Sequence, residues 1–149
     1  MKYLLMVSHA TLARGIKEAM EMLLGARSYV LACGMEDGMT PEQFRASVAQ
    51  AIEPISNADE VVLLADIAGG SPLKNTLVAL NDKGMGDNVL ALGGANLPMA
   101  ISAIMGIDDG LDLDAIRDAM LSFTSRLSWP SVRVTFWFSL IFLVFIMFV

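Results

Sequence analysis

The feature that most constrains this chain is the alternation of short apolar runs with longer segments of helical periodicity. Short apolar runs are typical of strands that are covered on both faces of a sheet. Strands that alternate with helices predict a parallel sheet, because each crossover returns the chain to the same edge. We therefore predict an α/β fold with a doubly wound, mostly parallel central sheet and helices on both faces. The predicted strands cover residues 3–7, 29–32, 61–65 and 89–92.

Helix start and stop signals divide the segments between these runs. The clearest start is Thr40, a hydroxyl cap followed by Pro41 at the first helical position and by Gln43 in the place of a capping box. Gly25 ends the first helical segment and Asp112 caps the last. The predicted helices cover residues 12–24, 41–55, 72–80, 98–106 and 113–121.

Two compositions meet in this chain. All sixteen acidic residues lie at or before Asp118, whereas six of the eleven aromatic residues lie within 136–148. We therefore expect one domain over residues 1–126 and an atypical hydrophobic C-terminal tail over 127–149. The tail has three interpretations: a strand exchanged within a dimer, a weak membrane segment, or sequence that is not native. Its sixteen uncharged residues from 134 to 149 fall short of the roughly 20 apolar residues that a membrane span needs.

Charge and cysteine content exclude several classes of protein. The net charge of −6 argues against nucleic-acid binding, which needs lysine and arginine to neutralise phosphates. Cys33 is the only cysteine, which fits a reducing cytoplasm and leaves no cysteine-rich metal site. Asp108 and Asp109 have no metal-ligand motif around them, so we interpret them as part of a solvated loop. We expect neither a metal nor a cofactor.

Three loops that follow predicted strands have unusual content. The first contains Ser8 and His9, the second is Asp66-Ile67-Ala68-Gly69-Gly70-Ser71-Pro72, and the third is Gly93-Gly94-Ala95-Asn96-Leu97-Pro98-Met99. The carboxyl ends of parallel strands meet at one edge of a sheet, where α/β proteins bind ligands. We therefore expect these loops to converge.

His9 is the only histidine, and its neighbourhood favours a chemical role. A lone histidine after a strand is more often structural. Neutral imidazole, however, is a nucleophile that can form a covalent phosphohistidine. Asp66 sits at another strand end, where its carboxylate could accept a hydrogen bond from one ring nitrogen and leave the other free to attack.

The glycine-containing loops could receive a phosphoryl group. Gly69 and Gly70 could turn backbone N–H groups inward, and Ser71 could cap the next helix or donate its hydroxyl. The N-terminus of that helix adds partial positive charge. Asn96 and Pro98 are further candidates for phosphate or partner binding. In isolation each loop is also consistent with a turn followed by a capped helix.

In combination, these three motifs resemble the IIA component of the mannose–fructose–sorbose family of the bacterial phosphoenolpyruvate-dependent sugar phosphotransferase system. The resemblance covers residues 1 to about 122 and includes the order and separation of the motifs. Two departures are Ala10, where the family often has glycine, and Ala68, where a bulkier residue is common. A polar or acidic C-terminal segment is also usual where this chain has its hydrophobic tail.

The resemblance implies a function, partners and residue roles. His9 would accept phosphate from the histidine-containing phosphocarrier protein and pass it to a IIB component, while membrane IIC and IID components import the sugar. Asp66 would orient His9, and Ser71 would contact the phosphate or the ring. The resemblance also implies a homodimer. It leaves the sugar open, because sugar specificity lies in the IIB and membrane components.

Three alternatives remain beside this interpretation. A phosphotransfer subunit that serves dihydroxyacetone kinase would have the same fold, although residues 69–72 look more like the sugar-transport branch. A response-regulator receiver would need an acidic pair where this chain has Ser8 and His9. A non-catalytic nucleotide- or flavin-binding module would explain the glycines but would leave His9 and Asp66 idle.

Overall fold

The computed structural model describes residues 1–125, and it describes side chains as far as residue 122. The predicted tail, with its three interpretations, lies outside the described residues. Within them, no helix is long and apolar enough to cross a membrane.

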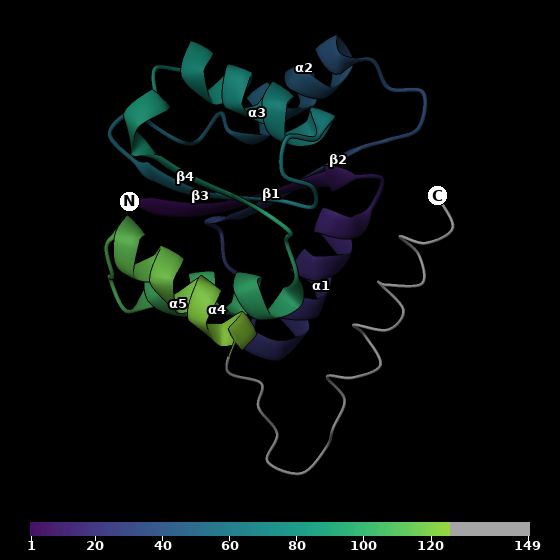
Figure 1. Cartoon of the computed structure of the whole chain (residues 1–149). Coiled ribbons are helices and arrows are strands. Elements are labelled where there is room, and N and C mark those ends of the chain that lie inside the picture. The colour runs from purple at the N-terminus through teal and green to yellow at the C-terminus, as the bar shows by residue number, and fades with distance from the viewer. Residues whose placement is uncertain (126–149) are drawn as a thin grey trace, which may run out of the picture.

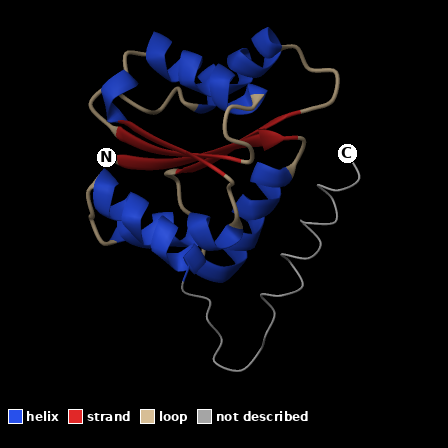
Figure 2. Ribbon diagram, in the orientation of Figure 1, coloured by secondary structure: helices blue, strands red, loops and turns tan. Residues whose placement is uncertain are grey.

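A four-stranded parallel sheet forms the central layer (Figure 2). Its strands are β1 (Lys2–His9), β2 (Val30–Met35), β3 (Glu60–Ala65) and β4 (Val89–Gly93), in the spatial order β2-β1-β3-β4. All three neighbouring pairs are parallel, as the sequence predicted. The chain moves outward from β1 in one direction to β2 and in the other to β3 and β4, so the order switches between β1 and β3.

Helices cover both faces of the sheet, which confirms the predicted doubly wound arrangement (Figure 1). One face carries α1 (Leu12–Leu24), α4 (Leu97–Asp108) and α5 (Leu113–Ser125). The other face carries α2 (Pro41–Ala51) and α3 (Ser71–Asp82). A short 3-10 turn, η1 (Gly86–Asn88), leads into β4.

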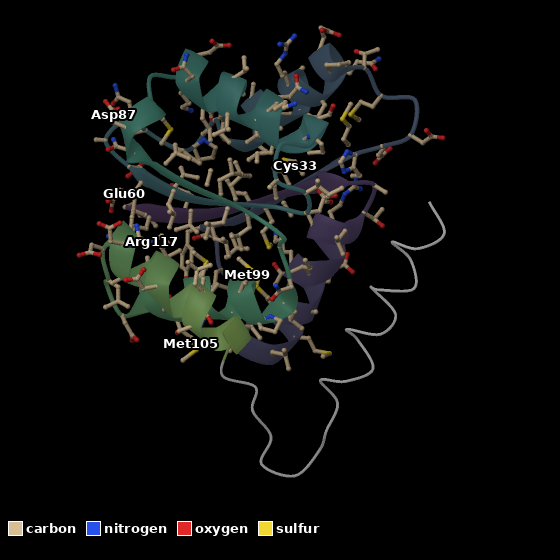
Figure 3. The ribbon with its side chains drawn as sticks, viewed as in Figure 1. Cys33, Glu60, Asp87, Met99, Met105 and Arg117 are labelled. Atoms are coloured by element: carbon tan, nitrogen blue, oxygen red, sulfur yellow. The ribbon has the colours of Figure 1, made fainter. Side chains whose placement is uncertain are left out.

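Alternate side chains of each strand enter two separate cores. Leu4 packs on the face of α1, α4 and α5, and Leu5 packs on the face of α2 and α3; both are fully buried. Figure 3 shows the same division, with Cys33 on the α3 side of the sheet and Met99 on the α4 side. Burial of both faces, at about 1.5–3 kcal/mol for each large apolar side chain, explains why the strands are apolar throughout.

Two sequence-based boundaries differ in ways that affect the core and the site. The predicted helix 41–55 ends at Ala51, because Pro54 lacks an N–H group and disfavours helical geometry in the residue before it. The predicted strand 3–7 continues to His9, because pairing with β2 extends to the pair His9 and Met35. His9 is therefore the last residue of a strand, where the sheet fixes its backbone. The predicted strand 29–32 begins one residue too early, because β2 starts at Val30, and the other predicted elements lie within the observed ones.

Candidate active site

The topology places His9 and Asp66 beside the switch in strand order. His9 ends β1, and Asp66 follows the last residue of the neighbouring strand β3. The backbone N–H of Asp66 donates to the carbonyl of Val7 at 3.2 Å, so the loop after β3 begins in contact with β1. The N–H of Gly94 donates in turn to the carbonyl of Asp66 at 3.2 Å. The three loops singled out in the sequence thus begin at one edge of the sheet.

Asp66 holds both the backbone and the ring of His9. Its Oδ2 lies 2.8 Å from the backbone nitrogen of His9 and 2.9 Å from Nδ1 of the His9 ring. The His9 side chain is 47% exposed, whereas that of Asp66 is only 10% exposed. The carboxylate is therefore fixed inside the loop, and the ring that it orients faces solvent.

The ionisation state of Asp66 assigns the proton on the ring. Burial by itself raises the pKa of this carboxyl group, but hydrogen bonds from the His9 backbone, the His9 ring and the backbone of Ile67 outweigh that effect and hold the pKa below its ordinary value. An ionised carboxylate can only accept hydrogen bonds. In the neutral ring, Nδ1 therefore carries the proton and Nε2 keeps its lone pair for chemistry.

The turn after Asp66 lies directly against the His9 ring. A Cβ atom at Gly70 would stand 3.2 Å from Cε1 of His9, so glycine lets the turn approach the ring closely. The N–H of Gly70 donates to the carbonyl of Ile67 and closes the turn, whereas the N–H groups of Gly69 and Ser71 have no acceptor among the described residues. Two N–H donors therefore remain free in this turn, and only that of Gly69 belongs to one of the two glycines.

Ser71 does not cap the following helix. The N-cap of α3 is Gly70, and Ser71 is the first helical residue, one position earlier than predicted. The Ser71 residue is exposed, and within the described residues its hydroxyl makes no hydrogen bond. The Ser71 hydroxyl is therefore available to another partner.

Asn96 and Pro98 organise the start of α4. The Asn96 side chain accepts from the N–H of Met99 at 3.0 Å and donates to the carbonyl of Gly94 at 3.1 Å. Both polar groups of its amide are therefore used within its own loop, as expected of an N-cap. Pro98 lies within the first two residues of α4, where its missing N–H has no cost.

The loop after β2, which carries no distinctive motif in the sequence, also reaches His9. A pocket of about 350 Å³ lies between His9 and the loop after β2, and its lining includes Met35, Glu36 and Met39. Glu36 forms an ion pair with Arg14 of α1, with Nη2 and Oε1 at 2.5 Å. The signal in the sequence was position alone: β2 is parallel to β1, so its end reaches the same edge.

The candidate site contains the His9 ring, the Asp66 carboxylate that bonds to it, and backbone N–H groups of the next turn. Among the residues whose side chains are described, no group of three or more His, Cys, Asp or Glu residues could hold a metal ion. The chemistry that this arrangement can perform is attack by Nε2 of His9 on an electrophile presented from solvent.

Comparison with solved structures shows the same fold in several proteins of the phosphotransferase system. Component EIIA from Streptococcus agalactiae is 23% identical, with a TM-score of 0.70 over 84% of this chain and 93% of the other. The PTS IIA protein associated with the fucose utilization operon of Streptococcus pneumoniae is 26% identical, with a TM-score of 0.68 over 81% and 90%. The mannose/sorbose-specific IIA subunit from Enterococcus faecalis is 21% identical, with a TM-score of 0.64 over 84% and 89%.

The family comparison covers the domain that contains the site. A search among curated proteins gave no match. The family model described as "PTS system fructose IIA component" matches residues 3–121, which include both His9 and Asp66. This chain therefore belongs to the mannose-type IIA family of the sugar phosphotransferase system and is a phosphotransfer component of that system.

Proposed function

We propose that His9 is the phosphorylated residue of this IIA component. In this proposal it accepts a phosphoryl group from the histidine-containing phosphocarrier protein and passes it to a IIB component. The observation that supports it most directly is the 2.9 Å contact between Nδ1 of His9 and the buried carboxylate of Asp66. That contact leaves Nε2 as the only ring nitrogen with a free lone pair.

The transfer balances without a further reactant. The lone pair of Nε2 forms a bond to phosphorus, while the bond between phosphorus and the carrier's histidine breaks and its electron pair returns to the carrier's ring. Positive charge then develops on the His9 ring, whose Nδ1 proton stays hydrogen-bonded to ionised Asp66. The free N–H groups of Gly69 and Ser71, the Ser71 hydroxyl and the N-terminus of α3 are the proposed donors to the phosphoryl oxygens.

Transfer to the IIB component repeats the same step in reverse. Membrane IIC and IID components take part only after IIB has received the phosphoryl group. Asn96 and Pro98 act in this proposal by setting the shape of the face that a partner meets, because the Asn96 amide bonds within its own loop and Pro98 has no N–H group. The homodimer stays a prediction from the resemblance.

The test is phosphorylation of the purified full-length chain with phosphoenolpyruvate, enzyme I and the phosphocarrier protein, followed by intact mass. We expect the native chain to gain one acid-labile phosphoryl group and His9→Ala to gain none. Since His9 is about half exposed, the variant is expected to fold, and a thermal melt checks this. A His9→Ala variant that is folded and still phosphorylated would contradict the proposal.

A further inference from the structure

The proposed function requires a phosphorylated His9, whose negative charge would be repelled by nearby carboxylates. A phosphoryl group on His9 would add negative charge beside ionised Asp66 and beside a pocket that includes Glu36 and Asp37. Among the described residues, no ion pair brings a lysine or arginine to Asp66. Backbone donors alone supply partial charges, so a full positive charge near the ring would stabilise the phosphorylated form.

Arg14 is a cation placed next to this site. Its Nη2 lies 3.4 Å from the position that a Cβ atom would take at Gly34, and the carbonyl oxygen of Ala10 lies 2.0 Å from that same position. The guanidinium group therefore lies beside the residue that directly follows His9. Its partner Glu36 lines the same pocket as His9.

The ion pair of Arg14 with Glu36 is suited to exchange. The two side chains are 45% and 56% exposed, and exposed ion pairs of this kind add little to stability. Arginine presents a planar fork of N–H donors that fits phosphate oxygens, and a doubly charged phosphoryl group attracts it more strongly than one carboxylate does. We propose that Arg14 is a phosphoryl-binding residue. When His9 is phosphorylated, Arg14 breaks its ion pair with Glu36 and binds the phosphoryl oxygens instead. No covalent bond and no proton changes place in this exchange.

A double-mutant cycle separates this role from simple neutralisation of Glu36. The variants are Arg14→Ala, Glu36→Gln and the two combined, and the quantity measured is the equilibrium distribution of phosphate between this chain and the phosphocarrier protein. Arg14→Ala is expected to shift that distribution about tenfold toward the carrier. The same shift is expected when Arg14→Ala is introduced into the Glu36→Gln background.

Two further variants serve as matched controls. Arg45 forms an exposed pair with Glu42 on α2 at 3.1 Å, so Arg45→Ala removes an equal charge away from the site and should leave the distribution unchanged. Arg14→Lys keeps the charge without the fork and should recover part of the loss. Thermal melts show whether each variant is folded.

The outcomes distinguish this inference from the proposed function on which it rests. If the native chain takes no phosphate from an active carrier, the proposed function fails and this inference fails with it. Suppose instead that the native chain is phosphorylated, but that Arg14→Ala leaves the phosphate distribution unchanged in the native chain or in the Glu36→Gln background. Only the role of Arg14 is then overturned. A lysine variant no better than alanine would also overturn it.

Discussion

The backbone at Ala10 has a φ of +48°, and Ala10 is the one non-glycine residue with a positive φ among those described. Its carbonyl is pressed against Gly34, and its N–H donates to the carbonyl of Met35, so the fold forces this conformation. The left-handed region costs an ordinary L-residue roughly 1–2 kcal/mol. This explains why glycine is common at this position in the proteins that the sequence resembles.

Replacing Ala10 by glycine should therefore stabilise the protein. We expect Ala10→Gly to raise the free energy of unfolding by about 0.5–1 kcal/mol, since relief of strain exceeds the added entropy of the unfolded chain. Ala68, in the loop after β3, has no positive φ, so Ala68→Gly should instead lower that free energy by a similar amount. Urea unfolding of both variants measures the difference. Destabilisation by Ala10→Gly would show that the strain is not relieved.

We expect Asp66 to act on His9 through charge as well as geometry. Asp66→Asn keeps the shape of the side chain but removes the negative charge that faces the ring. A hydrogen bond to a charged group contributes roughly 1.5–3 kcal/mol, so we expect phosphorylation of His9 to slow by about 10- to 100-fold. Quenched-flow transfer from the phosphorylated carrier measures the rate. The control Asp109→Asn removes an acidic loop residue outside the site, and an equal loss there would point to net charge rather than to Asp66.

At the scale of elements, the loop that contains Asp66 packs on the end of β4. A Cβ atom at Gly93 would lie 2.6 Å from the backbone nitrogen of Ala68, and backbone cannot yield as a flexible side chain can. Gly93 is therefore required by close contact between the loop after β3 and the end of β4. Gly15, in the interior of α1, meets nothing within 4 Å and has no such role.

These two glycines give opposite predictions. Gly93→Ala should push the loop away from β4, lower the free energy of unfolding by about 1–3 kcal/mol and slow phosphorylation of His9. Gly15→Ala should stabilise α1 by up to about 1 kcal/mol and leave phosphorylation unchanged. Thermal unfolding and the transfer assay test both. If Gly93→Ala were as stable and active as the native chain, the contact would have no influence on the site.

At the scale of the whole molecule, every residue assigned to the site lies within residues 9–98, far along the chain from the tail. Deleting residues 127–149 should therefore leave phosphorylation of His9 intact. If the tail meets solvent, we also expect the deletion to raise solubility, because exposed apolar sequence promotes association. The transfer assay and the concentration at which each chain precipitates measure the two effects. Unchanged solubility would count against the second expectation, and lost phosphorylation against the first.

The sequence by itself determined the α/β architecture and the pairing of the two residues at the centre of the candidate site. Runs such as 61–65 can be buried only between two helical layers, and parallel strands place their carboxyl ends at one edge. His9 and Asp66 could therefore be brought together from sequence position alone. The start of α2 was equally local, because the Thr40 and Gln43 capping box depends on residues three apart.

Only the tertiary structure decided which polar groups are left free and which loops meet. The end of β2 lies beside His9 because β2 pairs with β1, and that pairing brings Glu36 and Arg14 together across 22 positions of sequence. The tertiary structure also decided that the Asn96 amide bonds to Met99 and Gly94, and that the backbone of Ala10 is strained. Local patterns record burial and short-range hydrogen bonds, whereas strand order and the partners of polar atoms depend on packing between segments far apart in the chain.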